Sequence, residues 1–227
     1  MEESGRGRCR RRAERGTAGT TSYAEPIGTE QSPADTSRRV ARLLTEVLAP
    51  SVLAGALPFV IAVHAAGALW TGLAWGLLAS AFSTLIPYSM IWWGVRKGHL
   101  SDRHIGRREQ RTKPLVRGLA CVLIGLALLL VLHAPRELVA LVVAHFLGGL
   151  AATVVNHFWK LSVHAAVASG TMMVLAVAFG PALLATAVLV VAVGWSRVRL
   201  RDHTTAQVVA GTILGVLTTG LAFALLR

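Results

Sequence analysis

Residues 162–196 read SVHAAVASGTMMVLAVAFGPALLATAVLVVAVGWS, an apolar run of 35 residues that contains no Asp, Glu, Lys or Arg. A membrane crossing needs about 20 apolar residues, so the run is too long for one helix across a bilayer. Phe179-Gly180-Pro181 interrupts it, because proline cannot continue a helix and glycine favours a turn. The run therefore predicts a helical hairpin whose two short arms, 162–179 and 181–196, both cross the membrane.

Apolar segments also fill most of the remaining chain. Of the 227 residues, 54% are hydrophobic and the mean hydropathy is +0.58, values that exclude an ordinary soluble domain. We expect an all-α, polytopic bundle of about six or seven membrane spans over residues 47–227. The further predicted segments are 47–67, 69–93, 115–133, 137–157 and 204–226. The last contains Gly211-xxx-Gly215, a spacing that suits close helix packing in membranes.

The first 46 residues have a different composition. They contain nine Arg and seven acidic residues among Gly, Ser, Thr and Pro. We find no apolar periodicity in them and expect a disordered, solvated tail. The tail lacks the apolar core of a secretory signal peptide. We expect no nucleic-acid partner, and no disulfide between Cys9 and Cys121.

The distribution of cations predicts an orientation. If every segment crosses the membrane, twelve of the fourteen Lys and Arg beyond residue 46 fall on the same face as the tail. The positive-inside rule places that face in the cytoplasm. These twelve are Arg96, Lys97, Arg103, Arg107, Arg108, Arg111, Lys113, Arg117, Lys160, Arg197, Arg199 and Arg201.

Polar stretches meet at that face and carry histidines beside cations. Residues 159–164 read WKLSVH, residues 196–203 read SRVRLRDH, and a basic loop covers residues 100–114. Cations can hold phosphate oxygens while one imidazole attacks phosphorus and another protonates the leaving oxygen. Helices that begin near these histidines add partial positive charge and free N–H groups. The pattern predicts a phosphate site at the cytoplasmic membrane surface.

Two of these stretches resemble motifs of the type 2 phosphatidic acid phosphatase superfamily, which includes the vanadium haloperoxidases. That family carries Pro-Ser-Gly-His, followed by Ser-Arg-x5-His-x3-Asp. Here Ser162-Val163-His164 matches the first with Val for Gly, and Ser196-Arg197-x5-His203 matches the start of the second. A further family motif, Lys-x6-Arg-Pro, is matched in spacing by His104-x6-Arg111, and the surrounding loop is similar to an actinobacterial variant. The resemblance covers roughly residues 100–215.

The resemblance implies a role for each residue. His203 is expected to be the nucleophile, and His164 the acid that protonates the leaving oxygen. Gln207 takes the place of the family's Asp, which orients the nucleophile; an amide can accept the imidazole N–H but adds no charge. The expected phosphate-binding residues are Arg197, Ser162, Arg111, Arg103, His104 and Lys160. No metal and no cofactor are implied.

These expectations define a function and two alternatives. We expect a lipid phosphatase of a bacterial plasma membrane that hydrolyses a lipid phosphate or isoprenyl diphosphate through a phosphohistidine. An enzyme that ionises an allylic diphosphate and a non-catalytic phospholipid-binding protein remain open. We interpret the other histidines of the apolar segments, His64, His133, His145 and His157, as structural hydrogen-bonding groups.

Overall fold

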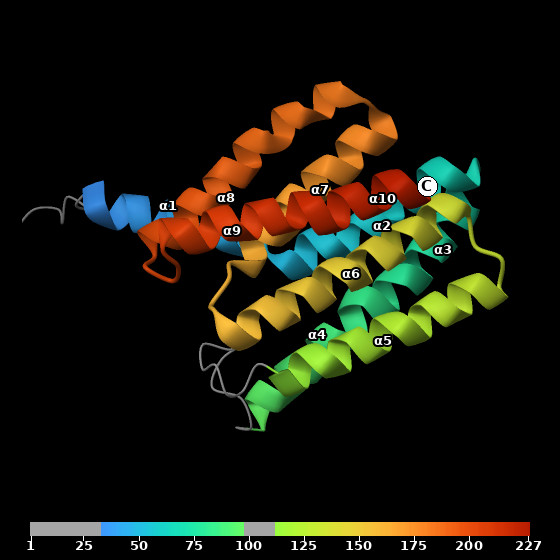
Figure 1. Ribbon diagram of the computed structural model, residues 1–227, viewed down its shortest axis with the longest axis horizontal. Coiled ribbons are helices and arrows are strands. Elements are labelled where there is room, and N and C mark those ends of the chain that lie inside the picture. Colours follow the sequence, from blue (N-terminus) through green and yellow to red (C-terminus); the bar gives the residue numbers. More distant parts are fainter. Residues whose placement is uncertain (1–32, 98–111) are drawn as a thin grey trace, which may run out of the picture. The chain divides into compact units, whose positions relative to one another are not determined.

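The computed structural model describes residues 33–97 and 112–227, and nearly all of these residues are helical (Figure 1). Two short segments, η1 and η4, are π-helical, and η3 is a 3-10 helix. The elements are α1 (Pro33–Val47), α2 (Pro50–Ala66), α3 (Leu69–Ser80), η1 (Ala81–Leu85), α4 (Ile86–Arg96), α5 (Thr112–Val131), α6 (Arg136–Phe158), α7 (Val163–Phe179), η3 (Pro181–Thr186), α8 (Ala187–Arg199), α9 (Thr205–Gly215), η4 (Val216–Gly220) and α10 (Leu221–Leu226).

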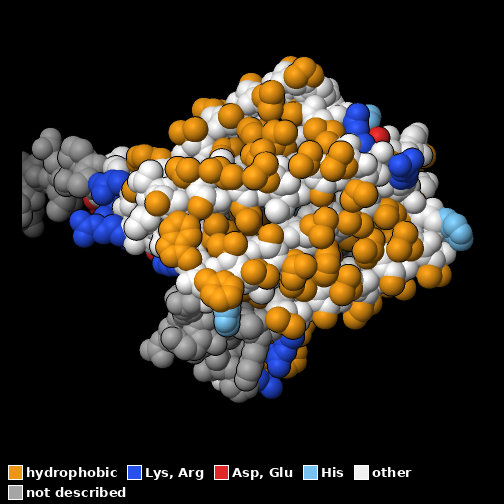
Figure 2. All heavy atoms as spheres, viewed as in Figure 1, with side chains coloured by type: hydrophobic (Ala, Val, Ile, Leu, Met, Phe, Trp, Pro, Cys, Tyr) orange, Lys and Arg blue, Asp and Glu red, His pale blue; other side chains and the backbone are white. Residues whose placement is uncertain are grey.

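The predicted polytopic bundle is confirmed. Within the described ranges, five helices are long and apolar enough to cross a membrane, and the bent pair α1–α2 brings the number to six. Helix α7, with 17 residues, is shorter, as expected for an arm of the hairpin. Figure 2 shows hydrophobic side chains spread over the sides of the helices, with charged side chains near the helix ends. This distribution suits a bundle whose sides face lipid.

The predicted disordered tail is wrong for residues 33–46, which belong to α1. Small and polar residues form the buried or half-buried side of this helix: Ser37, Ala41 and Thr45. Thr45 Oγ1 lies 3.2 Å from Ser196 Oγ, and Arg199 Nε donates to Ser37 Oγ at 2.7 Å. The helix packs on α8 through this side, while the apolar residues Val40, Leu43 and Val47, which recur at helical spacing, are exposed.

The hairpin at residues 179–181 is confirmed. Helix α7 ends at Phe179, and Gly180 adopts φ +112°, a backbone conformation that side chains rarely allow. Pro181 then begins η3, which continues into α8. The chain thus returns along α7, and α8 brings Ser196 and Arg197 back to the level at which α7 began.

The prediction of close packing at Gly211 and Gly215 is also confirmed. A Cβ atom at Gly211 would collide with the backbone oxygen of Ser162, and one at Gly215 with that of Ala166. Helices α7 and α9 are therefore in backbone contact, which only glycine permits. Together with the α6–α7 and α8–α9 connections, this contact gathers the predicted site at one end of the bundle (Figure 1).

Candidate active site

A cavity of about 880 Å³ lies where these segments meet. Its wall contains His164 from α7, Arg197 from α8 and His203 from the α8–α9 connection. The volume is within the range of about 300–1,000 Å³ that small-molecule sites occupy. The structure thus brings together the predicted nucleophile, the predicted acid and one predicted phosphate-binding residue, although 39 positions separate His164 from His203 in the sequence.

The spacing between Arg197 and His203 follows from the way α8 ends. Arg201 adopts φ +61°, and its N–H donates to the Val198 oxygen at 3.0 Å. The N–H groups of Asp202 and His203 both donate to the Arg197 oxygen, at 3.1 and 3.3 Å. This is a Schellman-type helix end, which folds the chain back onto the last turn. The fold-back holds His203 beside Arg197 at the cavity.

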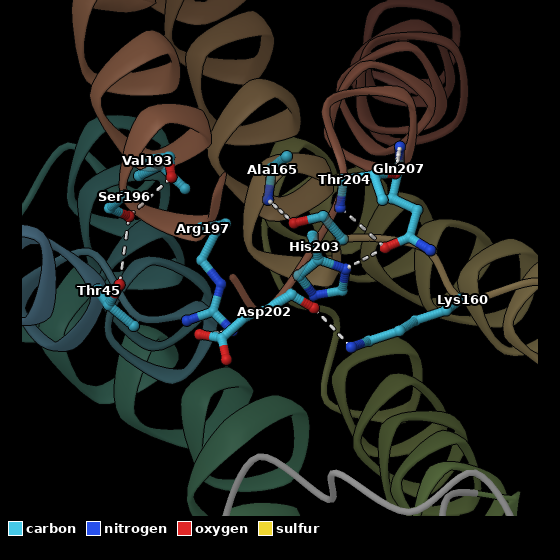
Figure 3. Close-up of polar contacts among 11 residues, drawn as sticks. Thr45, Lys160, Ala165, Val193, Ser196, Arg197, Asp202, His203, Thr204 and Gln207 are labelled. Carbon is cyan, nitrogen blue, oxygen red and sulfur yellow. Dashed lines mark hydrogen bonds and ion pairs between the residues drawn. The ribbon is translucent and has the colours of Figure 1, made fainter. Parts of the chain in front are cut away.

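His203 and Gln207 are in contact, as their spacing of one helical turn predicted. His203 Nδ1 lies 3.1 Å from Gln207 Oε1 (Figure 3). The same oxygen accepts the Thr204 N–H at 3.2 Å, while Thr204 Oγ1 accepts the Gln207 N–H at 3.3 Å. A backbone N–H can only donate, so the group facing His203 is the amide oxygen. Nδ1 of His203 is then the protonated nitrogen, and the lone pair lies on Nε2.

The surroundings of His203 keep its imidazole neutral. Burial lowers its pKa from 6.5 to about 4, and the positive charges of Lys160 and Arg197 act in the same direction. The hydrogen bond to Gln207 and the negative charge of Asp202 oppose this shift of the pKa. At neutral pH the ring therefore carries no proton on Nε2, which is the state that a nucleophile requires.

Arg197 is buried, with 5% of its surface exposed, and its charge is matched by an acidic residue. Arg197 Nη2 lies 3.1 Å from Asp202 Oδ2 (Figure 3). Arg197 Nε is buried without a hydrogen-bond partner among the described residues. Lys160 Nζ donates to the backbone oxygen of Asp202, which holds its charge next to the same loop. The guanidinium thus keeps one N–H donor that an anion can use, while Asp202 partly neutralises its positive charge.

His164 and Ser162 lie at the start of α7, where Ser162 precedes the first helical residue, and they differ in their placement. His164 lines the cavity and is 6% exposed. Ser162 is completely buried, and its Oγ accepts the Ala165 N–H at 3.4 Å as the cap of the helix. Ser162 is not among the residues that line the cavity, and neither are Lys160 and Gln207. Lys160 instead contacts the backbone oxygen of Asp202, and Gln207 contacts His203.

Three predicted phosphate-binding residues, Arg103, His104 and Arg111, lie outside the described residues. Two groups that the sequence did not point to do line the cavity, Glu46 near the end of α1 and Tyr88 of α4. Glu46 is the last residue of the segment that we expected to be disordered, so its placement could not be inferred. Tyr88 lies in a largely apolar segment, and nothing in the neighbouring sequence marks it as a residue of the cavity wall.

No protein-family model, curated protein or solved structure matches this chain significantly. A neutral imidazole with a fixed tautomer, a buried guanidinium and a second imidazole share one cavity at the end of a membrane bundle. This set can bind a phosphate group, attack its phosphorus and protonate a leaving oxygen.

Proposed function

We propose that this protein is a membrane phosphatase that hydrolyses a lipid phosphate or an isoprenyl diphosphate. The observation that carries the proposal is the single cavity lined by His164, Arg197 and His203, with His203 held neutral and hydrogen-bonded through Nδ1. The cavity lies next to helices that cross a membrane, so its substrate is expected to be a lipid.

In the proposed reaction, Nε2 of His203 attacks phosphorus and forms a P–N bond while the P–O bond to the leaving group breaks. His164 gives its proton to the departing oxygen, and Arg197 binds the non-bridging oxygens as their charge increases. Water then attacks the phosphohistidine, and His164 takes a proton from this water. Inorganic phosphate leaves, and both imidazoles return to their starting states.

Gln207 and Asp202 have supporting roles in this scheme. Gln207 accepts the Nδ1 proton of His203 in a hydrogen bond and so fixes the ring orientation. The lone pair on the other ring nitrogen, Nε2, then points away from Gln207. Asp202 partly neutralises Arg197, and an incoming phosphate competes with it for the guanidinium. The expected result is a site that holds Arg197 in position before the anion arrives.

The proposal is tested by turnover of purified protein in detergent with farnesyl diphosphate and with phosphatidate, measuring phosphate and pyrophosphate separately. We expect phosphate from at least one substrate. His203→Ala should lower the rate by several orders of magnitude while substrate still binds. The matched control is His133→Asn, which changes an exposed histidine between α5 and α6.

The products also separate the alternatives. Release of pyrophosphate with a rearranged hydrocarbon would favour ionisation of an allylic diphosphate. Binding of both lipids with neither product would favour a non-catalytic protein. An acid-labile, alkali-stable phosphoryl group on the wild-type protein, absent from His203→Ala, would support the phosphohistidine directly. Normal turnover by His203→Ala would refute the proposed mechanism.

A further inference from the structure

A second cavity, of about 230 Å³, lies between the helices deeper in the bundle. Its wall is contributed by α2, η1, α4, α5, α6, α7, α9 and η4 and is mostly apolar. The apolar residues of this wall include Pro87, Leu119, Val167 and Leu214. An apolar cavity lined by membrane-spanning helices is a suitable environment for hydrocarbon and a poor one for a charged ligand.

The two cavities are neighbours. Ile91 and Val163 line both of them, and Val163 directly precedes His164. The apolar cavity therefore begins next to the place where a phosphate beside His164 would lie. The larger cavity has the charged groups, and the smaller one has the apolar wall, which is the division that a lipid phosphate requires.

Local departures from regular packing keep the second cavity open. Gly118 of α5 and Gly149 of α6 present no side chain to it. The π-helical segments η1 and η4 also contribute to its wall, and such segments are frequent at functional sites.

Two polar atoms in this wall are left without partners. Ser83 Oγ and His145 Nδ1 are buried and make no hydrogen bond to the described residues. Natural proteins keep such unfavourable arrangements mainly at functional sites.

We propose that this cavity binds one apolar chain of the lipid whose phosphate occupies the candidate active site. The proposal rests on the function proposed above. On this proposal a five-carbon prenyl group stays close to the phosphate, whereas a fifteen-carbon chain reaches into the cavity.

The test fills the cavity from its wall. A Cβ atom at Gly118 would meet Pro87 Cβ at 3.7 Å, an ordinary contact, so Gly118→Leu can enter the cavity without a backbone collision. Ala120→Leu, two residues away on the exposed side of α5, is the matched control. The rates of phosphate release are compared for farnesyl and dimethylallyl diphosphate.

We expect Gly118→Leu to lower kcat/KM for farnesyl diphosphate at least tenfold, because about two methylene groups lose their contacts. Its kcat/KM for dimethylallyl diphosphate should change less than about twofold, which also shows that the variant is folded. Ala120→Leu should leave both values unchanged. Equal effects of Gly118→Leu on the two substrates, or no effect on either, would overturn the proposal while phosphatase activity stands.

A second measurement needs no turnover. A farnesyl phosphonate with a photoreactive group at the end of its chain cannot be hydrolysed, and its crosslinks can be mapped by peptide sequencing. We expect labels on α5 and α6 around the second cavity, with reduced labelling in Gly118→Leu. Labels confined to other helices would exclude the cavity as the chain site. Correct labelling without phosphate release would refute the catalytic function alone.

Discussion

The contact between Gln207 and His203 makes the most direct prediction about catalysis. Gln207→Leu removes the oxygen that lies 3.1 Å from His203 Nδ1 and leaves the N–H of a half-buried imidazole without an acceptor. The loss of such a partner costs about 1–3 kcal/mol. If this cost appears in the barrier to attack on phosphorus, kcat falls roughly 5- to 150-fold. The assay is the initial rate of phosphate release at pH 7.

A control must separate orientation of the imidazole from helix capping, because Gln207 also belongs to the capping box that begins α9. Thr204→Val removes the hydroxyl that accepts the Gln207 N–H but leaves the contact with His203. We expect it to cost about 1 kcal/mol of stability with a nearly unchanged kcat. If the two variants lower kcat equally, or if Gln207→Leu releases phosphate normally, Gln207 does not orient His203.

Gln207→Glu provides the opposite change. It keeps the length of the side chain and adds a negative charge beside His203, which should raise the pKa of the imidazole from about 4 by roughly 1–3 units. The nucleophile must be neutral, so activity is lost as the pH falls through this pKa. The acid limb of kcat/KM should therefore move from about pH 4 in the wild type to about pH 5–7 in the variant. An unmoved limb would contradict the assignment of His203.

Other consequences are open to simple measurements. Activity should survive EDTA, and vanadate should inhibit competitively with substrate; strict Mg²⁺ dependence would contradict the proposed chemistry. Asp202→Asn should tighten vanadate inhibition about two- to fivefold, since Arg197 loses a competitor worth about 0.5–1 kcal/mol; weaker inhibition would mean that Asp202 mainly positions Arg197. His145→Leu should raise the melting temperature by several degrees, because it removes a buried nitrogen without a partner. With both native cysteines replaced by serine, Arg201→Cys should react with a membrane-impermeant thiol reagent only from the cytoplasm and His133→Cys only from outside, and the reverse would overturn the proposed orientation.

The sequence predicted the features that depend on local pattern. Long apolar segments gave the helices, Gly180-Pro181 gave the hairpin, and the spacing of Gly211 and Gly215 gave the close helix contact. The contact of His203 with Gln207 followed from a separation of one helical turn. In each case one short stretch of chain contains the physical cause.

The features that were missed depend on side chains far apart in sequence. Helix α1 belongs to the bundle through contacts with α8, such as that of Thr45 with Ser196, and no local pattern specifies so distant a partner. Asp202 faces Arg197 because of the turn that ends α8, which residue types alone do not specify. The apolar cavity depends on π-helical segments and on gaps between helices.

The glycine contact between α7 and α9 has a consequence for the timing of catalysis. Helix α7 carries His164, and α9 begins two residues after His203. Because the two backbones touch, the proposed acid and nucleophile are held at one separation before any lipid arrives. If the two histidines act as proposed, their relative position is set during folding, which is the condition called preorganisation. We expect movements that admit or release substrate to occur in other elements, such as α1 and α4, which line the cavity without carrying either histidine.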